Sequence, residues 1–169
     1  MAQPAVGALS GLKELYLPSN LIGNDGLVAL GRALTAGALP TLQGISLMHN
    51  RIGDDGLVAF LQVLGEGRGD DDEGGGGGLA QLRWLHLDYN RVGDLGLRAL
   101  AEALSRGSLP RLQKLFVDIV SPDLEAICAA KGVECETPAP TPCRDLPADQ
   151  REACAQSEIA QFGVCKTCG

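Results

Sequence analysis

Leucine and other aliphatic residues recur along this chain in a two-part pattern that is repeated four times. The first part reads Leu-x-x-Leu-x-Leu, or close to it, and begins at Leu12, Leu42, Leu82 and Leu112. Its last apolar residues alternate with polar ones, which is the period of a short strand with one buried face. The second part places leucines three and four residues apart, which predicts a helix with one apolar stripe. Each repeat is therefore expected to form one strand and one helix.

The repeats start 30, 40 and 30 residues apart (12 to 42, 42 to 82 and 82 to 112). Such self-similarity indicates a stacked repeat array, an architecture used more often for binding than for catalysis. The ten additional residues of the second repeat fall within residues 65–78, a stretch of glycine and charged residues without any apolar side chain. We expect this insertion to be a flexible acidic loop at the C-terminal end of the second helix.

Signals for the helix ends fall at matching places in the repeats. Acids stand where an N-cap or first helical turn is expected, at Asp25, Asp55 and Asp94. Glycine stands where a helix should stop, at Gly37 and Gly107, with Pro40 and Pro110 shortly beyond. A strand, a turn and a helix in each repeat predict a curved solenoid, with parallel strands on its concave side and helices on its convex side.

An asparagine follows each of the first three predicted strands, at Asn20, Asn50 and Asn90. The chain turns inward there, so backbone groups would be buried without partners. A side-chain amide can both donate and accept hydrogen bonds. We therefore predict that these asparagines form a structural ladder from repeat to repeat.

The combined pattern, Leu-x-x-Leu-x-Leu-x-x-Asn-x-Ile-Gly-Asp-x-Gly-Leu-x-Ala-Leu, resembles the ribonuclease-inhibitor-like class of leucine-rich repeats. This class also forms the repeat regions of NOD-like receptors and Ran GTPase-activating proteins. The resemblance covers roughly residues 6–135 and implies an α/β leucine-rich-repeat solenoid. It is specific for the fold and nearly silent about the partner. Regulation of a small GTPase is an alternative function that it implies, although the residues for that activity cannot be matched in this chain.

The fourth repeat departs from the pattern after Val117 and is expected to close the array. Ser121 and Pro122 form a compact helix start, as cap and first residue. Cys128 stands on the apolar stripe of this helix, where we expect a small buried thiol. Gly132 should end the helix, and residues 133–135 could add a last short strand.

The composition changes after residue 135, which we take as the end of the array (1–135). Residues 136–142 read as a proline-rich linker, followed by a cysteine-rich tail over 143–169 in which 147–162 can form one helix. The tail cysteines are Cys143, Cys154, Cys165 and Cys168. Disulfides are slightly favoured over a zinc site, and both over a redox Cys-x-x-Cys motif. The tail also faintly resembles the small disulfide-bonded ShK toxin domain, but it lacks two of that family's cysteines.

Aromatic residues make up 4% of the chain, so the core must be aliphatic, and the formal charge of −7 argues against nucleic acid or an anionic membrane as the main partner. No apolar run is long enough to span a bilayer, and residues 1–9 lack the features of a secretory signal. A cytoplasmic location is slightly favoured. Disulfides in the tail would instead indicate a secreted or cell-surface protein.

The strand positions that point away from the predicted core, with the turns beside the asparagines, hold most of the aromatic residues of the chain. We predict that they form a concave protein-binding face centred on Trp84. Its members are Tyr16, Met48, Trp84, His86, Asp88, Tyr89 and Phe116. Aromatic residues and methionine are enriched in protein interfaces. His49 and His86 have no candidate nucleophile or third metal ligand beside them, so we expect neither an enzyme nor a cofactor.

Overall fold

The computed structural model describes residues 9–66 and 79–138 of the 169-residue chain. Contacts divide the chain into the units Met1–Thr137 and Pro138–Gly169, and all described helices and strands belong to the first. The predicted tail helix and the four tail cysteines lie outside the described residues, as does most of the predicted acidic loop.

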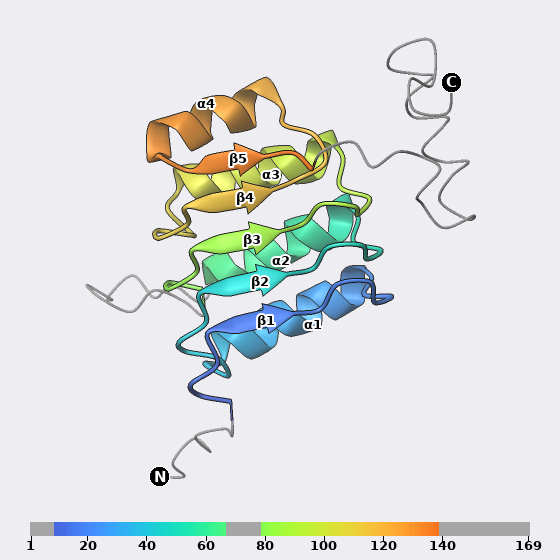
Figure 1. The fold of residues 1–169 in the computed structure, drawn as a ribbon, viewed down its shortest axis with the longest axis vertical. Helices are drawn as coiled ribbons and strands as arrows, with labels where there is room; N and C mark the ends of the chain where they lie inside the picture. The colour runs from blue at the N-terminus through green and yellow to red at the C-terminus, as the bar shows by residue number, and fades with distance from the viewer. Residues whose placement is uncertain (1–8, 67–78, 139–169) are drawn as a thin grey trace. The chain divides into compact units, whose positions relative to one another are not determined.

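Strands and helices alternate along the described part of the chain, as the two-part pattern predicts. The strands are β1 (Glu14–Tyr16), β2 (Gly44–Ser46), β3 (Trp84–His86), β4 (Lys114–Phe116) and β5 (Glu134–Glu136). The helices are α1 (Asn24–Thr35), α2 (Asp54–Glu66), α3 (Asp94–Ser105) and α4 (Pro122–Lys131). The strands form one parallel sheet in sequence order, and the helices lie along one side of it (Figure 1). This is a leucine-rich-repeat solenoid.

The repeats stack in register, so equivalent residues become neighbours. Leu15, Ile45, Leu85, Leu115 and Cys135 lie side by side across the five strands. Each is the middle residue of its strand and faces the helix side, because successive strand residues alternate between the two faces. Residues that lie 30 or 40 positions apart in the sequence are therefore neighbours on adjacent strands, which are about 4.8 Å apart.

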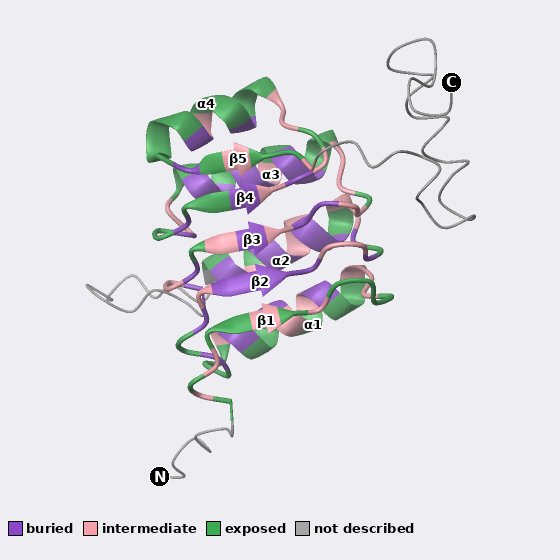
Figure 2. Cartoon of the chain, viewed as in Figure 1, coloured by how far each residue is buried: buried purple, intermediate pink, exposed green. Residues whose placement is uncertain are grey.

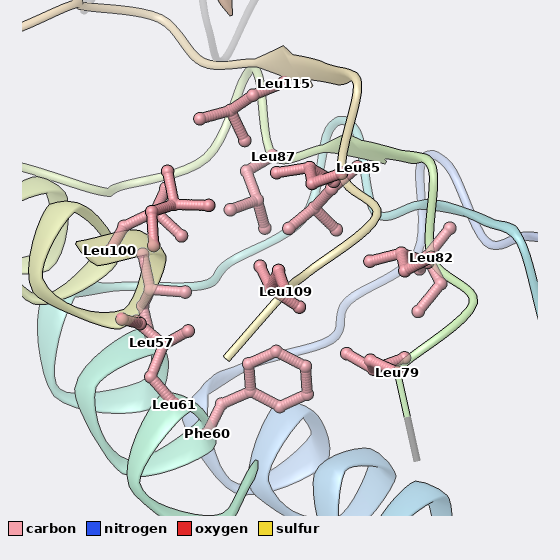
Figure 3. Packing of buried hydrophobic residues seen from close by; sticks show 14 of the residues in the cluster. Leu57, Phe60, Leu61, Leu79, Leu82, Leu85, Leu87, Leu100, Leu109 and Leu115 are labelled. Atoms are coloured by element: carbon pink, nitrogen blue, oxygen red, sulfur yellow. The ribbon is translucent and has the colours of Figure 1, made fainter. Parts of the chain in front are cut away.

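The core between sheet and helices is built mainly from leucine, as the low aromatic content predicts. Phe60 is the largest fully buried side chain of the described residues and belongs to this core, as do Leu57 and Leu61 of the same helix (Figure 3). Its ring lies against Gly31 of α1, where an added Cβ would come within 2.8 Å of Phe60 Cδ2. A glycine in one helix thus makes room for an aromatic ring from the next.

Helices α1 and α3 end in the predicted way, at a glycine in the left-handed conformation. The backbone angle φ is +81° at Gly37 and +76° at Gly107, a region that costs glycine little. Helix α2 differs, because Gly65 is not in this conformation and the helix continues to Glu66. The expectation that residues 65 and 66 already belong to the loop is therefore wrong.

A side chain of one repeat caps the helix of the next repeat, which was not predicted from the sequence. Acids lie in the first turns as predicted, but the N-caps of α1 and α3 are Gly23 and Gly93, which have no side chain to donate or accept. Instead, Oδ1 of Asp54 in α2 accepts hydrogen bonds from the N–H groups of Gly93 (2.6 Å) and Gly96 (3.0 Å) at the start of α3. The start of α3 is therefore capped by the repeat before it.

The fourth repeat closes the array nearly as expected. Ser121 caps α4 by accepting from Leu124 N–H at 3.3 Å, Pro122 is the first helical residue, and Gly132 (φ +68°) ends the helix. Strand β5 begins one residue later than predicted. Cys128 is buried, but the expectation of a free thiol is wrong, because Cys128 forms a disulfide with Cys135 of β5.

Within the described ranges, every helix is too short or too polar to cross a lipid bilayer.

Candidate partner-binding face

The sheet has one side covered by helices and an opposite side that carries the predicted binding residues. We call this second side the strand face, made of the first and last residues of the strands β1 to β5. In register, one row across it reads Tyr16, Ser46, His86, Phe116 and Glu136, and the other reads Glu14, Gly44, Trp84, Lys114 and Glu134. Aromatic side chains from β1, β3 and β4 therefore share one surface.

These aromatic side chains contact one another in a continuous chain, which we call the aromatic row. It consists of Tyr16, Trp84, His86 and Phe116. The ring centres of Tyr16 and Trp84 are 5.3 Å apart, and those of Trp84 and His86 are 5.4 Å apart in an edge-on arrangement. His86 stacks on Phe116 with a centre distance of 3.8 Å and an interplanar angle of 9°. The row spans four strands without a gap.

Contact between Tyr16 on β1 and Trp84 on β3 requires the indole to cross β2, and Gly44 makes this possible. A Cβ at Gly44 would lie 1.8 Å from Cε2 of Trp84, so the indole occupies the space of a side chain. Gly44 is buried as a result. Gly44 is not among the residues predicted for the binding face. A glycine inside a strand pattern, which often marks a close approach, was the available signal.

The turns after the strands position His49 and Tyr89 beside the ladder asparagines. Ser19, His49 and Tyr89 have φ of +55°, +53° and +56°, and each precedes a ladder asparagine. Such left-handed non-glycine residues are uncommon, and here their backbone is fixed by neighbouring repeats. His49 and Tyr89 stack with ring centres 4.1 Å apart and nearly parallel planes. They form a second aromatic pair beside the aromatic row.

Asn50 and Asn90 bridge consecutive repeats, whereas Asn20 does not. Oδ1 of Asn50 accepts from Ile22 N–H (3.0 Å) in the first repeat, and its Nδ2 donates to Leu17 O in that repeat and to Leu47 O in its own (both 2.9 Å). Asn90 makes the equivalent bonds one repeat later. Asn20 is exposed and donates to Pro18 O alone among the described residues.

Asp88 was predicted as a member of the binding face, yet its side chain is buried, with 4% of the residue exposed. Its Oδ1 lies 3.3 Å from Nδ1 of His86, which is an ion pair when the imidazole is protonated. No donor in the described residues reaches this oxygen with hydrogen-bond geometry. Asp88 is therefore a buried neighbour of His86 and is not itself a contact surface.

Asp118 substitutes for a missing turn in the fourth repeat. In the second repeat, the carbonyl of Met48 accepts from Ser19 N–H of the first repeat, and Asp88 O likewise accepts from His49 N–H. At the next step, the carboxylate of Asp118 accepts from the N–H groups of Tyr89 (2.7 Å) and Asn90 (3.2 Å). Burial raises the pKa of Asp118, the charge of Asp88 adds to this, and the two hydrogen bonds oppose it.

Charged residues lie at both ends of the aromatic row. Tyr16 donates to Glu14 at 3.2 Å, and desolvation, followed by this bond and the Glu14 charge, raises the Tyr16 pKa. At the other end, Lys114 Nζ lies 3.0 Å from Glu134 and 3.2 Å from Glu136. Hydrogen bonds to Glu134 and then Glu136 raise the pKa of Lys114. These groups are exposed and form a polar rim.

The predicted binding residues differ in how far they reach solvent. Tyr16 is 60% exposed, whereas Met48, Trp84, His86, Tyr89 and Phe116 are half-buried. The aromatic side chains cover one another, so the face is packed before any partner arrives. No group of three His, Cys, Asp or Glu side chains in the described parts of the chain is placed to hold a metal ion.

The fold and repeat geometry are those of a leucine-rich-repeat solenoid. In agreement, the family pattern described as "Leucine Rich repeat" matches residues 38–61 and 82–101. The first segment contains β2 and most of α2, and the second contains β3 and most of α3. A search of curated proteins gives no match to the chain. Leucine-rich repeats generally mediate protein–protein interactions.

Proposed function

We propose that this protein binds a protein partner through its strand face, with the aromatic row at the centre of the contact. The observation that carries this proposal is the unbroken contact of Tyr16, Trp84, His86 and Phe116 on the helix-free side of the sheet. Large aromatic side chains that are already packed lose little conformational freedom on binding. Surrounded by polar residues, they match the composition of interface hot spots.

The second part of the proposal concerns the family class. We assign the array to the ribonuclease-inhibitor-like leucine-rich repeats, because each of the first three repeats carries a full α-helix after its asparagine turn. The protein would then act as a non-enzymatic scaffold. Regulation of a small GTPase remains a prediction from the sequence resemblance, and single-turnover GTP hydrolysis measured with a panel of GTPases would test it. No acceleration in any of them would remove that alternative.

Affinity capture with paired variants tests the binding proposal. Trp84→Ala and Phe116→Ala should each abolish capture of the partner that the unchanged protein retains, because each removes a ring from the centre of the contact. The midpoint of thermal unfolding should change by no more than about 5 °C, since these side chains lie outside the leucine core. Leu95→Ala is the matched control, because Leu95 is an exposed apolar residue on α3, away from the strand face. Capture that survives both aromatic substitutions would contradict the proposal.

A further inference from the structure

The first repeat exposes apolar residues that the later repeats bury. In the second repeat, the core positions Leu42, Ile45, Leu47, Ile52 and Phe60 are at most 1% exposed. Their counterparts in the first repeat are Leu12, Leu15, Leu17, Ile22 and Leu30, and all five are only partly buried. Figure 2 shows the same difference between the strands, because β1 is coloured as exposed and intermediate and β2 as buried. Leu9 is 58% exposed, whereas the matching Leu39, Leu79 and Leu109 are buried. We call this surface, together with the free edge of β1, the first-repeat face.

The backbone of β1 has a free edge on the same side. In the other repeats, the first amides of each strand region donate to the strand before it, as Gly44 and Trp84 N–H donate to Lys13 O and Gln43 O. The corresponding N–H groups of Lys13 and Glu14 have no acceptor within residues 9–66 and 79–138. Likewise, Ser46 O accepts from Leu17 N–H of the repeat before, and Tyr16 O has no such donor in those ranges. The free backbone groups of β1 are therefore the ones that would bond to a further parallel strand.

Asn20 shows the same incompleteness. Asn50 and Asn90 each accept from a backbone N–H of the preceding repeat and donate to one of its carbonyls. Asn20 stands at the equivalent position and makes a single local bond, to Pro18 O, among the residues that the structure describes. Within those residues its Oδ1 and its second amide hydrogen have no partner, so they match the groups that a strand and turn beside β1 would present.

The entry to β1 has the form of the connections inside the array. In each later repeat, a turn brings the chain from the preceding helix to the strand, closed by a bond from Leu42, Leu82 or Leu112 N–H to the carbonyl three residues earlier. Leu12 N–H donates to Leu9 O in the same way, at 2.9 Å. The first strand is therefore entered through the same kind of turn as the later strands.

We propose that the first-repeat face binds one further leucine-rich unit, with its strand parallel to β1 and its helix beside α1. The interfaces between the described repeats indicate what such a partner must provide. Its apolar strand-and-helix layer would cover the exposed leucines. Its backbone would form hydrogen bonds with Lys13 and Glu14 N–H, Tyr16 O and the Asn20 side chain. A second copy of this chain fits less well. Its opposite edge, β5, presents Glu134 and Glu136, and pairing of two β1 edges would be antiparallel.

An insertion variant supplies such a unit directly. The third repeat, residues 82–111, has no long insertion, so a second copy of it can be placed between Gly11 and Leu12 of the full chain. The junction from residue 111 to Leu12 then copies the natural junction from residue 111 to Leu112. Hydrogen exchange should slow by about tenfold or more at the amides of Glu14 and Tyr16, and Tm should rise by about 5 °C or more.

A matched control uses the same insert with Leu85→Asp and Leu87→Asp in the added copy, which should give neither effect. The proposal is overturned if the amides of Glu14 and Tyr16 exchange as fast in the insertion variant as in the unchanged protein, including the case in which the added unit stays unfolded. It is also overturned if sedimentation shows the unchanged protein to be a dimer in which these two amides are already protected, because a second copy would then be the occupant. These readouts do not involve capture of a partner by the strand face, so they are independent of the proposed function.

Discussion

The indole of Trp84 lies over Gly44 of the neighbouring strand, where a Cβ would come within 1.8 Å of Cε2. This close approach is what brings Trp84 into contact with Tyr16, two strands away. The aromatic row therefore depends on the absence of one side chain. An alignment of the repeats shows Gly44 at the position of Trp84. That the indole fills the space left by the missing side chain of Gly44 follows only from the pairing of β2 with β3.

The first prediction is that Gly44→Ala forces the indole off β2. Trp84 is the single tryptophan of the sequence, so intrinsic fluorescence reports on it alone. We expect its emission maximum to shift to longer wavelength, because the ring becomes more hydrated, and we expect partner capture to weaken. Gly11→Ala is the control, since an added Cβ there meets no atom within 4 Å. An unchanged emission spectrum for Gly44→Ala would show that the ring is not held in this position.

The second prediction compares two asparagines. Asn50→Ala leaves the Ile22 N–H and the Leu17 and Leu47 carbonyls without this partner in a buried turn, and should lower the free energy of unfolding by about 3 kcal/mol. Asn20→Ala removes one exposed bond and should change it by less than about 0.5 kcal/mol. Urea denaturation measures both. Equal losses for the two variants would contradict a bridging role for Asn50.

The third prediction concerns the cap between repeats. Asp54→Ala removes the acceptor for Gly93 and Gly96 N–H and should cost about 1–2 kcal/mol of unfolding free energy. Asp55→Ala is the closest control, because Asp55 lies in the same first turn of α2 and is exposed. Both substitutions remove one negative charge near the helix start, so the difference between them isolates the contact with α3. No difference in denaturation midpoint would argue against that cap.

The fourth prediction uses the raised pKa of Asp118. A carboxyl whose pKa is higher in the folded protein favours folding when protonated, and this contribution is lost as the pH rises through the folded pKa. Asp118→Asn keeps an acceptor for Tyr89 N–H and does not ionise. The stability of Asp118→Asn relative to the unchanged protein should therefore increase between about pH 4 and pH 7. Urea denaturation at several pH values tests this, and a constant difference across the range would refute it.

The fifth prediction concerns the link between α4 and β5. The disulfide between Cys128 and Cys135 closes a short loop at the end of the array, so its reduction should lower the free energy of unfolding by about 2 kcal/mol on the chain-entropy argument. Thermal unfolding with and without reductant measures this. Cys135→Ser should behave like the reduced protein and no longer respond to reductant. A response that persists in this variant would assign the effect to other cysteines.

Much of the fold follows from the sequence alone, because its signals are local and repeated. The alternation after Leu42 and Leu82 indicates strands, the three- and four-residue spacing of leucines indicates helices, and Gly37 and Gly107 indicate where helices stop. Repetition at a nearly fixed period then determines that strands pair in order and in parallel. The choice of strand positions that face away from the core likewise follows from the period of two along a strand.

Tertiary structure decided what depends on contact between repeats. Asp88 occupies an outward-facing position in the sequence pattern, but its side chain is buried, with Oδ1 3.3 Å from Nδ1 of His86. Asp54 looks like an ordinary first-turn acid, yet it caps the next helix. The pairing of Cys128 with Cys135 and the space that Gly44 gives to Trp84 belong to the same group. A linear pattern specifies which face a residue occupies, whereas the atoms opposite that face come from a segment some thirty residues away.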